Sequence, residues 1–100
     1  MTTALILGCG SIGSRHARNL ARLGVDVTVC DVEVPAAHRL AEELGAATVS
    51  REDAATYDLI VIATPTHRHV SDLAWALDHN ANVFVEKPLA CSLTDLAEAR

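Results

Sequence analysis

The segment GCGSIG at residues 8–13 constrains the fold more than any other part of this 100-residue chain. It follows a short apolar run, Thr3–Leu7, and opens a segment, Ile12–Leu23, whose apolar residues recur at helical spacing. A G-x-G-x-x-G sequence between a strand and a helix, with an acidic residue about 20 positions further on, is typical of a dinucleotide-binding βαβ unit. Asp31 stands 23 positions after Gly8, so the sequence predicts such a unit.

Each position of this motif has a physical role in binding a dinucleotide. Gly8 permits the tight turn, Gly10 lets a pyrophosphate approach the backbone, and Gly13 lets helix and strand pack closely. Ser11 and Ile12 open the helix, whose free N–H groups and positive dipole end favour an anion without any lysine. The alternative is that the glycines only form a compact turn between strand and helix.

Beyond the motif, strand-like and helix-like segments alternate along the chain. This alternation predicts an α/β fold, a doubly wound parallel (Rossmann) sheet of about five strands in the order 3-2-1-4-5. Its ligand crevice should lie at the carboxyl ends of strands 1 and 4. We expect the sheet to be truncated before a sixth strand, which would leave strand 5 as an exposed edge open to homo-oligomerisation. The later strands are expected at 25–29, 46–49, 58–63 and 82–85, and helices at 36–44 and 67–79, with a helical turn at 52–55, a C-terminal cap at Asn80 and a last helix capped by Ser92 or Thr94.

The composition is that of one small domain with an aliphatic core. Half of the residues are hydrophobic but only 3% are aromatic, so alanine-rich helices should pack on valine and isoleucine strands. A net charge of −5 argues against nucleic-acid binding. No apolar run approaches the roughly 20 residues of a membrane span, and no signal pattern is visible. Three cysteines without Cys-x-x-Cys spacing indicate a reducing, cytoplasmic setting, with neither a disulfide framework nor a zinc site.

Asp31 is the residue expected to select the cofactor. At the end of the second strand it can accept hydrogen bonds from the adenosine ribose, and its charge repels a 2′-phosphate, so NAD is favoured over NADP. Residues 32–35 contain no Arg or Lys to hold such a phosphate, although Arg39 can reach back from the next helix. The alternative is an aspartate that caps a helix or faces solvent.

Three segments resemble the Gfo/Idh/MocA family of NAD(P)-dependent oxidoreductases: GCGSIGSRH at 8–16, ATPTHRH at 63–69 and EKPLA at 86–90. The resemblance covers the whole chain, and EKPLA is the most specific segment. The family usually has Asn at the position of Thr66 and Gly at that of Asn80. The resemblance implies cofactor contacts at Ala63, Thr64, Pro65, His69, Glu86 and Pro88, with Lys87 as the catalytic residue near the nicotinamide and a Lys-Pro bond that is cis.

Lys87 also has a chemical rationale of its own. Oxidation of an alcohol removes a hydride from carbon and a proton from oxygen, so a positioned group must take or share that proton. A lysine does this either as a base, when burial lowers its pKa, or as an ammonium group that stabilises the developing alkoxide. The alternative is a solvated surface charge.

The remaining histidines and the tryptophan are given non-catalytic roles. His67 and His69 are two residues apart and do not share a helix face, so no metal site is expected. His16 should orient or pack beside the glycine motif. Trp75 should anchor its helix to the sheet.

The resemblance also implies a second α/β domain that supplies the substrate contacts, and this domain is absent from the sequence. Residues 1–100 are therefore expected to be the NAD(P)-binding domain of an enzyme that transfers hydride between a nicotinamide cofactor and a sugar, polyol or related alcohol, inactive without its substrate domain. One alternative is a stand-alone NAD-binding sensor or partner subunit without catalysis, and another is a degenerate remnant. The sequence does not identify the substrate.

Overall fold

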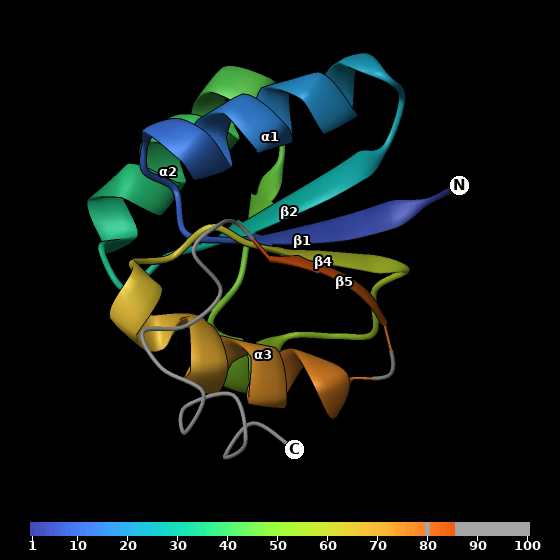
Figure 1. Ribbon diagram of the computed structural model, residues 1–100. Coiled ribbons are helices and arrows are strands. Elements are labelled where there is room, and N and C mark those ends of the chain that lie inside the picture. Colours follow the sequence, from blue (N-terminus) through green and yellow to red (C-terminus); the bar gives the residue numbers. More distant parts are fainter. Residues whose placement is uncertain (80, 86–100) are drawn as a thin grey trace.

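A computed structural model describes residues 1–79 and 81–85, which form a parallel sheet covered by helices on both faces (Figure 1). The predicted α/β class is confirmed. The strands are β1 (Thr3–Leu7), β2 (Asp26–Cys30), β3 (Ala47–Thr48), β4 (Leu59–Ile62) and β5 (Asn82–Val85). The α-helices are α1 (Ser11–Arg22), α2 (Val34–Leu44) and α3 (His69–Leu77), and two 3-10 turns are η1 (Arg51–Asp53) and η2 (Thr66–Arg68).

The strands lie in the predicted order β3-β2-β1-β4-β5, all parallel. β1 is central, and its last residue, Leu7, is in register with Cys30 of β2 on one side and Ile62 of β4 on the other. The chain leaves β1 toward β2 and later returns to add β4 on the opposite side. The carboxyl ends of β1 and β4 are therefore the point where the winding reverses, and ligands bind at such a point in open α/β sheets.

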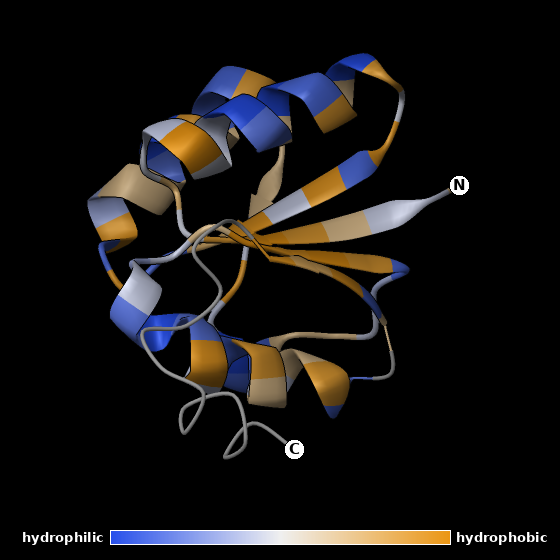
Figure 2. Cartoon of the chain, in the orientation of Figure 1, coloured by the Kyte–Doolittle hydropathy of each residue, from blue (hydrophilic) through white to orange (hydrophobic). Residues whose placement is uncertain are grey.

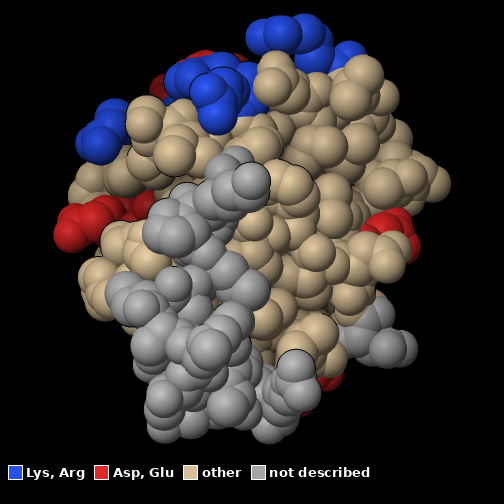
Figure 3. Space-filling model, viewed as in Figure 1, with Lys and Arg blue, Asp and Glu red and all other residues tan. Residues whose placement is uncertain are grey.

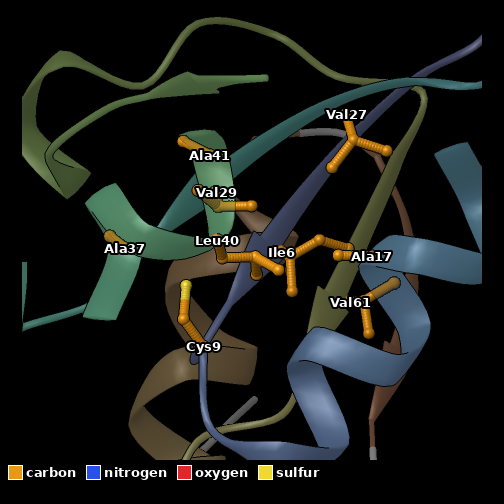
Figure 4. Packing of buried hydrophobic residues seen from close by; sticks show 9 residues of the cluster. All are labelled: Ile6, Cys9, Ala17, Val27, Val29, Ala37, Leu40, Ala41 and Val61. Carbon is orange, nitrogen blue, oxygen red and sulfur yellow. The ribbon is translucent and has the colours of Figure 1, made fainter. Parts of the chain in front are cut away.

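Two apolar clusters hold the layers together. One lies between the sheet and the helices α1 and α2, and the other lies on the opposite face, beneath α3. In Figure 2 the strands are mostly apolar, whereas α1 carries many polar residues, and the apolar strands are the pattern expected for a sheet buried on both faces. Figure 4 shows the first cluster, in which the alanines of α1 and α2 let these helices approach the sheet. The cluster consists of Ile6, Cys9, Ala17, Val27, Val29, Ala37, Leu40, Ala41 and Val61.

The third strand is shorter than predicted. Only Ala47–Thr48 pairs with β2, instead of residues 46–49, and both residues are exposed. Neither side chain of β3 is buried, so packing adds little to the backbone pairing of these two residues. The amide of Val49 still donates to the carbonyl of Val29 at 3.1 Å, so the segment stays beside β2 after the regular strand ends.

Several helix boundaries also differ from the sequence predictions. α2 begins at Val34, two residues before the predicted start, with Pro35 in its first turn, and it ends at Gly45, whose φ of 65° is the left-handed conformation that glycine favours. The helix expected over 67–79 begins as the turn η2 and continues as α3 to Leu77. The helical turn expected at 52–55 is η1, over Arg51–Asp53.

Two apolar residues of the segment around α1 do not face the core as their spacing suggested. Ile12 is 42% exposed and Leu23 lies largely in solvent, whereas Ala17 is buried. The predicted caps at Asn80, Ser92 and Thr94 lie outside the described residues. Within residues 1–79 and 81–85, no helix has the length and apolarity needed to cross a membrane.

Candidate dinucleotide-binding site

The loop between β1 and α1 is held by close backbone packing at two of its glycines. Gly8 has a φ of 99°, and a Cβ there would lie 2.6 Å from the carbonyl oxygen of Ala63. A Cβ on Gly13 would lie only 1.7 Å from the carbonyl oxygen of Gly8. Both values are below any tolerable contact, so the loop, the helix and the turn after β4 can approach one another only because these side chains are missing.

Gly10 has a different environment. A Cβ built on it meets no heavy atom of the described residues within 4 Å, and its φ of −73° is open to any amino acid. Nothing in the packing or backbone geometry of the described chain therefore requires glycine at this position. The space that Gly10 leaves is the space in which the pyrophosphate of a dinucleotide would approach the backbone, so the loop fits that group.

The first turn of α1 faces the same space. Gly10 is its N-cap, no side chain of the described residues caps the helix, and the first turn holds no acidic residue. The hydroxyl of Ser14 instead donates to the Cys9 carbonyl at 3.0 Å. The N–H groups at Ser11 and Ile12 therefore start the helix without a side-chain acceptor, which is the arrangement that binds anions at helix N-termini.

Asp31 is fixed beside the glycine loop by backbone amides. Its Oδ2 accepts the N–H of Cys9 at 2.6 Å, and its Oδ1 accepts the N–H of Glu33 at 2.8 Å. A carboxylate has about four acceptor positions, so each oxygen can accept one further hydrogen bond. The side chain is thus oriented in advance and can still receive the two hydroxyl groups of a ribose. Asp31 does not cap α2, because its bond to the Glu33 amide lies before the first turn and no side-chain hydrogen bond of the described residues caps that helix.

Two hollows open at this edge of the sheet. The larger, of about 620 Å³, extends along Asp31–Val34 and the segment Ser50–Glu52. The smaller, of about 290 Å³, extends past Ile12 to His69. Gly10 and residues 63–65 line both. An extended molecule with two halves joined at Gly10 fits this arrangement.

The turn after β4 is held by a network of polar side chains around the buried His69 and Asp72. Nε2 of His69 donates to the Thr64 carbonyl at 2.6 Å, and the Thr64 hydroxyl donates to Asp72 Oδ2 at 2.5 Å. Asp72 is 1% exposed, and its other oxygen receives Nη1 of Arg51 at 2.8 Å, while Arg68 lies 4.0 Å away. One buried carboxylate therefore connects the turn after β4 to η1, on the far side of the larger hollow.

The structure brings together most of the residues that the sequence singled out. Gly8, Gly10 and Asp31 line the larger hollow, and Ser11, Ile12 and His69 line the smaller. Gly13 lies behind the loop and acts through packing. Glu86, Lys87 and Pro88 lie outside the described residues, so their predicted contacts stay predictions.

Sequence reasoning missed Arg51, Arg68 and Asp72. They lie 20 to 41 positions beyond Asp31 and belong to no recognisable motif, and only the fold brings them to the larger hollow. The arginine considered from the sequence, Arg39, is not among the lining residues.

Two other predicted roles concern residues around the site. Trp75 packs against the cluster beneath α3, as expected for an anchor. The ring of His16 lies 5.4 Å from that of Phe84, edge to face, so it contacts β5.

The electrostatics of the site differ from those of the outer surface. In Figure 3 the basic side chains gather over the helices at the top of the view, α1 and α2 in Figure 1. The larger hollow instead combines Asp31, Glu33 and Glu52 with Arg51 and Arg68. Inside the loop, burial raises the pKa of the Cys9 thiol to about 12, and the nearby charge of Asp31 acts in the same direction. The thiol therefore stays neutral at physiological pH.

Comparison with known proteins gives a consistent result. Residues 2–100 match the family model GFO_IDH_MocA, described as an oxidoreductase family with an NAD-binding Rossmann fold. Similar curated proteins include an uncharacterized oxidoreductase of Streptococcus pneumoniae serotype 4, 34% identical over 98 residues (93% of this chain, 26% of that protein). Another is the scyllo-inositol 2-dehydrogenase (NAD(+)) of Bacillus subtilis strain 168, 34% identical over 101 residues (90% of this chain, 29% of that protein).

A solved structure extends the similarity to three dimensions. The myo-inositol 2-dehydrogenase from Lactobacillus plantarum superposes with a TM-score of 0.86 at 31% identity, over 98% of this chain and 31% of that one. The sequence thus spans between about a quarter and a third of the length of these relatives.

Proposed function

Because the chain belongs to the Gfo/Idh/MocA oxidoreductase family, with its NAD-binding Rossmann fold, we propose that it is the cofactor domain of a dehydrogenase acting on a polyol, a sugar or a related alcohol. The relatives named as inositol dehydrogenases support this substrate class. We propose that residues 1–100 form this domain and that a second domain supplies the substrate contacts. The observation that carries the proposal is the open space at Gly10, a residue that lines both hollows, because a dinucleotide has two halves joined at its pyrophosphate.

Each half of the dinucleotide has a set of residues to hold it. We propose that Asp31 accepts the adenosine ribose hydroxyls and that the N–H groups at Ser11 and Ile12 hold the pyrophosphate. The nicotinamide half would then lie in the smaller hollow, against Pro65 and near His69. When bound, the nicotinamide supplies the hydride acceptor, and the residues of the chain bind and orient it.

We propose Lys87 as the catalytic residue that handles the proton of the substrate hydroxyl. Its support is the chemistry of alcohol oxidation, which needs a group that takes this proton or stabilises the alkoxide, together with the Glu-Lys-Pro segment of the family. Glu86 and Pro88 would flank it beside the cofactor. The gene's complete product, assayed with a panel of inositols and sugars, should lose most of its turnover on Lys87→Met while NAD⁺ affinity changes little.

We also propose a preference for NAD over NADP. Asp31, Glu33 and Glu52 place negative charge along the hollow where a 2′-phosphate would lie. The arginines that line it, Arg51 and Arg68, both lie beside the buried carboxylate of Asp72, so their charge is partly neutralised.

The expected partners and location form part of the same proposal. β5 is the edge of the sheet within the described residues, and its Phe84 is 48% exposed, which supports self-association along this edge. Light scattering on the purified chain tests it: dimers or larger species are expected, and a monomer at all concentrations excludes it. A cytoplasmic location is supported by the buried free thiols of Cys9 and Cys30.

Calorimetric titration tests the cofactor proposal directly. The wild-type chain should bind NAD⁺ with at least about tenfold higher affinity than NADP⁺. Asp31→Asn should weaken NAD⁺ binding about tenfold, because it loses a charge-assisted acceptor, and should narrow the difference between the two cofactors. No heat of binding at millimolar NAD⁺ from a folded, monodisperse sample excludes the proposal.

A further inference from the structure

The larger hollow contains an arginine that neither the glycine motif nor the Asp31 site accounts for. We propose that the adenine ring of the dinucleotide stacks on the guanidinium of Arg51, and that the buried Asp72 is the positioning residue that holds this guanidinium in place. The inference rests on the proposed NAD-binding function and adds the residue that recognises the base.

The position of Arg51 follows from the topology. Arg51 begins η1, three positions after the end of β3, and β3 runs parallel to β2. The residues that follow both strands therefore meet at one edge of the sheet. With the pyrophosphate at Gly10 and the ribose at Asp31, the base must lie farther along the same hollow. The residues that line it there are Val32, Glu33, Val34, Ser50, Arg51 and Glu52.

This end of the hollow also exposes apolar surface. Val32 is 67% exposed and Val34 is 55% exposed, although both are β-branched aliphatic residues. A flat aromatic base would cover these side chains and remove their surface from water. An apolar side paired with a planar cation is a suitable environment for adenine, which has π faces and polar edges.

Arg51 is held before any ligand arrives. Its Nη1 lies 2.8 Å from Asp72 Oδ1, and its Cζ lies 5.1 Å from the centroid of the Trp75 ring. The side chain is about three-quarters buried yet still lines the hollow. A guanidinium is planar and stacks on aromatic rings, and one whose rotamers are already restricted loses little entropy when a second ring stacks on it.

Asp72 is the centre of this arrangement. It is buried on α3 and receives both the Thr64 hydroxyl and Arg51, so it sets the distance between the turn after β4 and η1. Without its charge, Arg51 would lose its ion pair and keep the contact with Trp75. Asp72 lies at the wall of the larger hollow, but it is only 1% exposed and its two carboxylate oxygens are engaged by the Thr64 hydroxyl and by Arg51. Its effect on binding should therefore depend on Arg51.

The test uses three ligands and the single tryptophan of the chain. NAD⁺ and AMP contain adenine, whereas nicotinamide mononucleotide does not. Arg51→Met should lower the affinity for NAD⁺ and for AMP about tenfold each, the range expected for the loss of stacking on one base. The affinity for nicotinamide mononucleotide should not change. Arg51→Lys should also lower the affinity for both adenine ligands, because lysine keeps the positive charge but has no planar guanidinium group to stack on the base. Arg22→Met, an exposed arginine at the end of α1, is the matched control and should bind all three ligands as the wild type does.

Trp75 provides a second readout. Because it is the only tryptophan and lies beside Arg51, its emission should change when AMP binds to the wild-type chain and should not change in Arg51→Met. Asp72→Asn should weaken AMP about threefold in the wild-type background and have no effect in the background of Arg51→Met. A purely structural Asp72 would instead show the same loss in both backgrounds.

The outcomes separate the inference from the function on which it rests. If the wild-type chain binds none of the three ligands, the proposed NAD-binding function is wrong. If it binds NAD⁺ and Arg51→Met binds AMP equally well, or weakens nicotinamide mononucleotide as much as AMP, the assignment of Arg51 is wrong. Circular dichroism establishes whether each variant is folded. If Arg51→Met does not fold, Arg51→Lys provides the test.

Discussion

Two neighbouring turns form the walls of the proposed site, and they are built in opposite ways. The glycine loop, residues 8–13, follows β1, and the threonine turn, residues 63–69, follows β4. The glycine loop depends on side chains that are missing, because backbone atoms occupy their places at Gly8 and Gly13. The threonine turn depends on polar side chains, the buried His69 and Asp72 and the partly buried Thr64.

The difference shows how each turn resists deformation. The glycine loop is held by close contact between backbone atoms, so an added methyl group is the change that should destabilise it most. The threonine turn is held by part-buried hydrogen bonds to the buried Asp72 and from the buried His69, so the loss of a single polar atom destabilises it most. Substitutions that add or remove one group should therefore affect the two turns in different ways.

The largest effect is expected for Gly13→Ala. Its Cβ would lie 1.7 Å from the Gly8 carbonyl oxygen, so either α1 or the loop must move. We expect a loss of about 4 kcal/mol or more, a large part of the stability of a domain this small. Thermal unfolding followed by circular dichroism measures it. A variant that melts within a few degrees of the wild type would show that the contact is not the constraint described above.

Thr64→Val should cost about 2 kcal/mol, because the nearly isosteric valine cannot donate to the buried Asp72 carboxylate. Thr64→Ser keeps the hydroxyl and is the control, with a loss below about 1 kcal/mol. Urea unfolding of the wild type and the two variants measures the difference. Equal stability of the Thr64→Val and Thr64→Ser variants would mean that the hydroxyl contributes nothing and that the threonine turn is held by packing alone.

The same contrast explains what could be predicted from the sequence. The glycine loop was recognisable because its constraint is local: glycines at fixed spacing between an apolar run and a helix. The strand order followed from the alternation of elements, and Asp31 from its distance to Gly8. The threonine turn is different, because Asp72 meets Arg51 across 21 positions and no local pattern records that contact. The short β3 was missed for a similar reason, since pairing at a sheet edge depends on tertiary contacts.

Gly10→Ala should separate binding from folding within the glycine loop. The added methyl group meets no described atom, and the backbone conformation is allowed for alanine. Stability should therefore change by less than about 1 kcal/mol, because the less flexible unfolded chain offsets the loss of glycine at the N-cap of α1. NAD⁺ affinity should fall at least tenfold, about 1.4 kcal/mol, because the methyl group occupies the space of the pyrophosphate. Calorimetry and thermal unfolding of one sample give both values. An unchanged NAD⁺ affinity would show that the pyrophosphate does not bind beside Gly10.

The smallest effect concerns pH and the one side chain between the first two glycines. Burial raises the pKa of Cys9 to about 12, so between about pH 9 and pH 12 the thiol ionises in the unfolded chain and stays neutral in the folded one. The stability present below pH 9 is therefore lost as the pH rises, by about 1 kcal/mol between pH 8 and pH 10. Cys9→Ala should lose less stability over this interval, although Cys30, whose pKa is also raised by burial, leaves part of the slope. Thr64→Val, on the other turn, should keep the full wild-type slope. If urea unfolding at the two pH values gives Cys9→Ala and the wild type the same slope, the thiol is not desolvated, and the interior of the glycine loop is open to water.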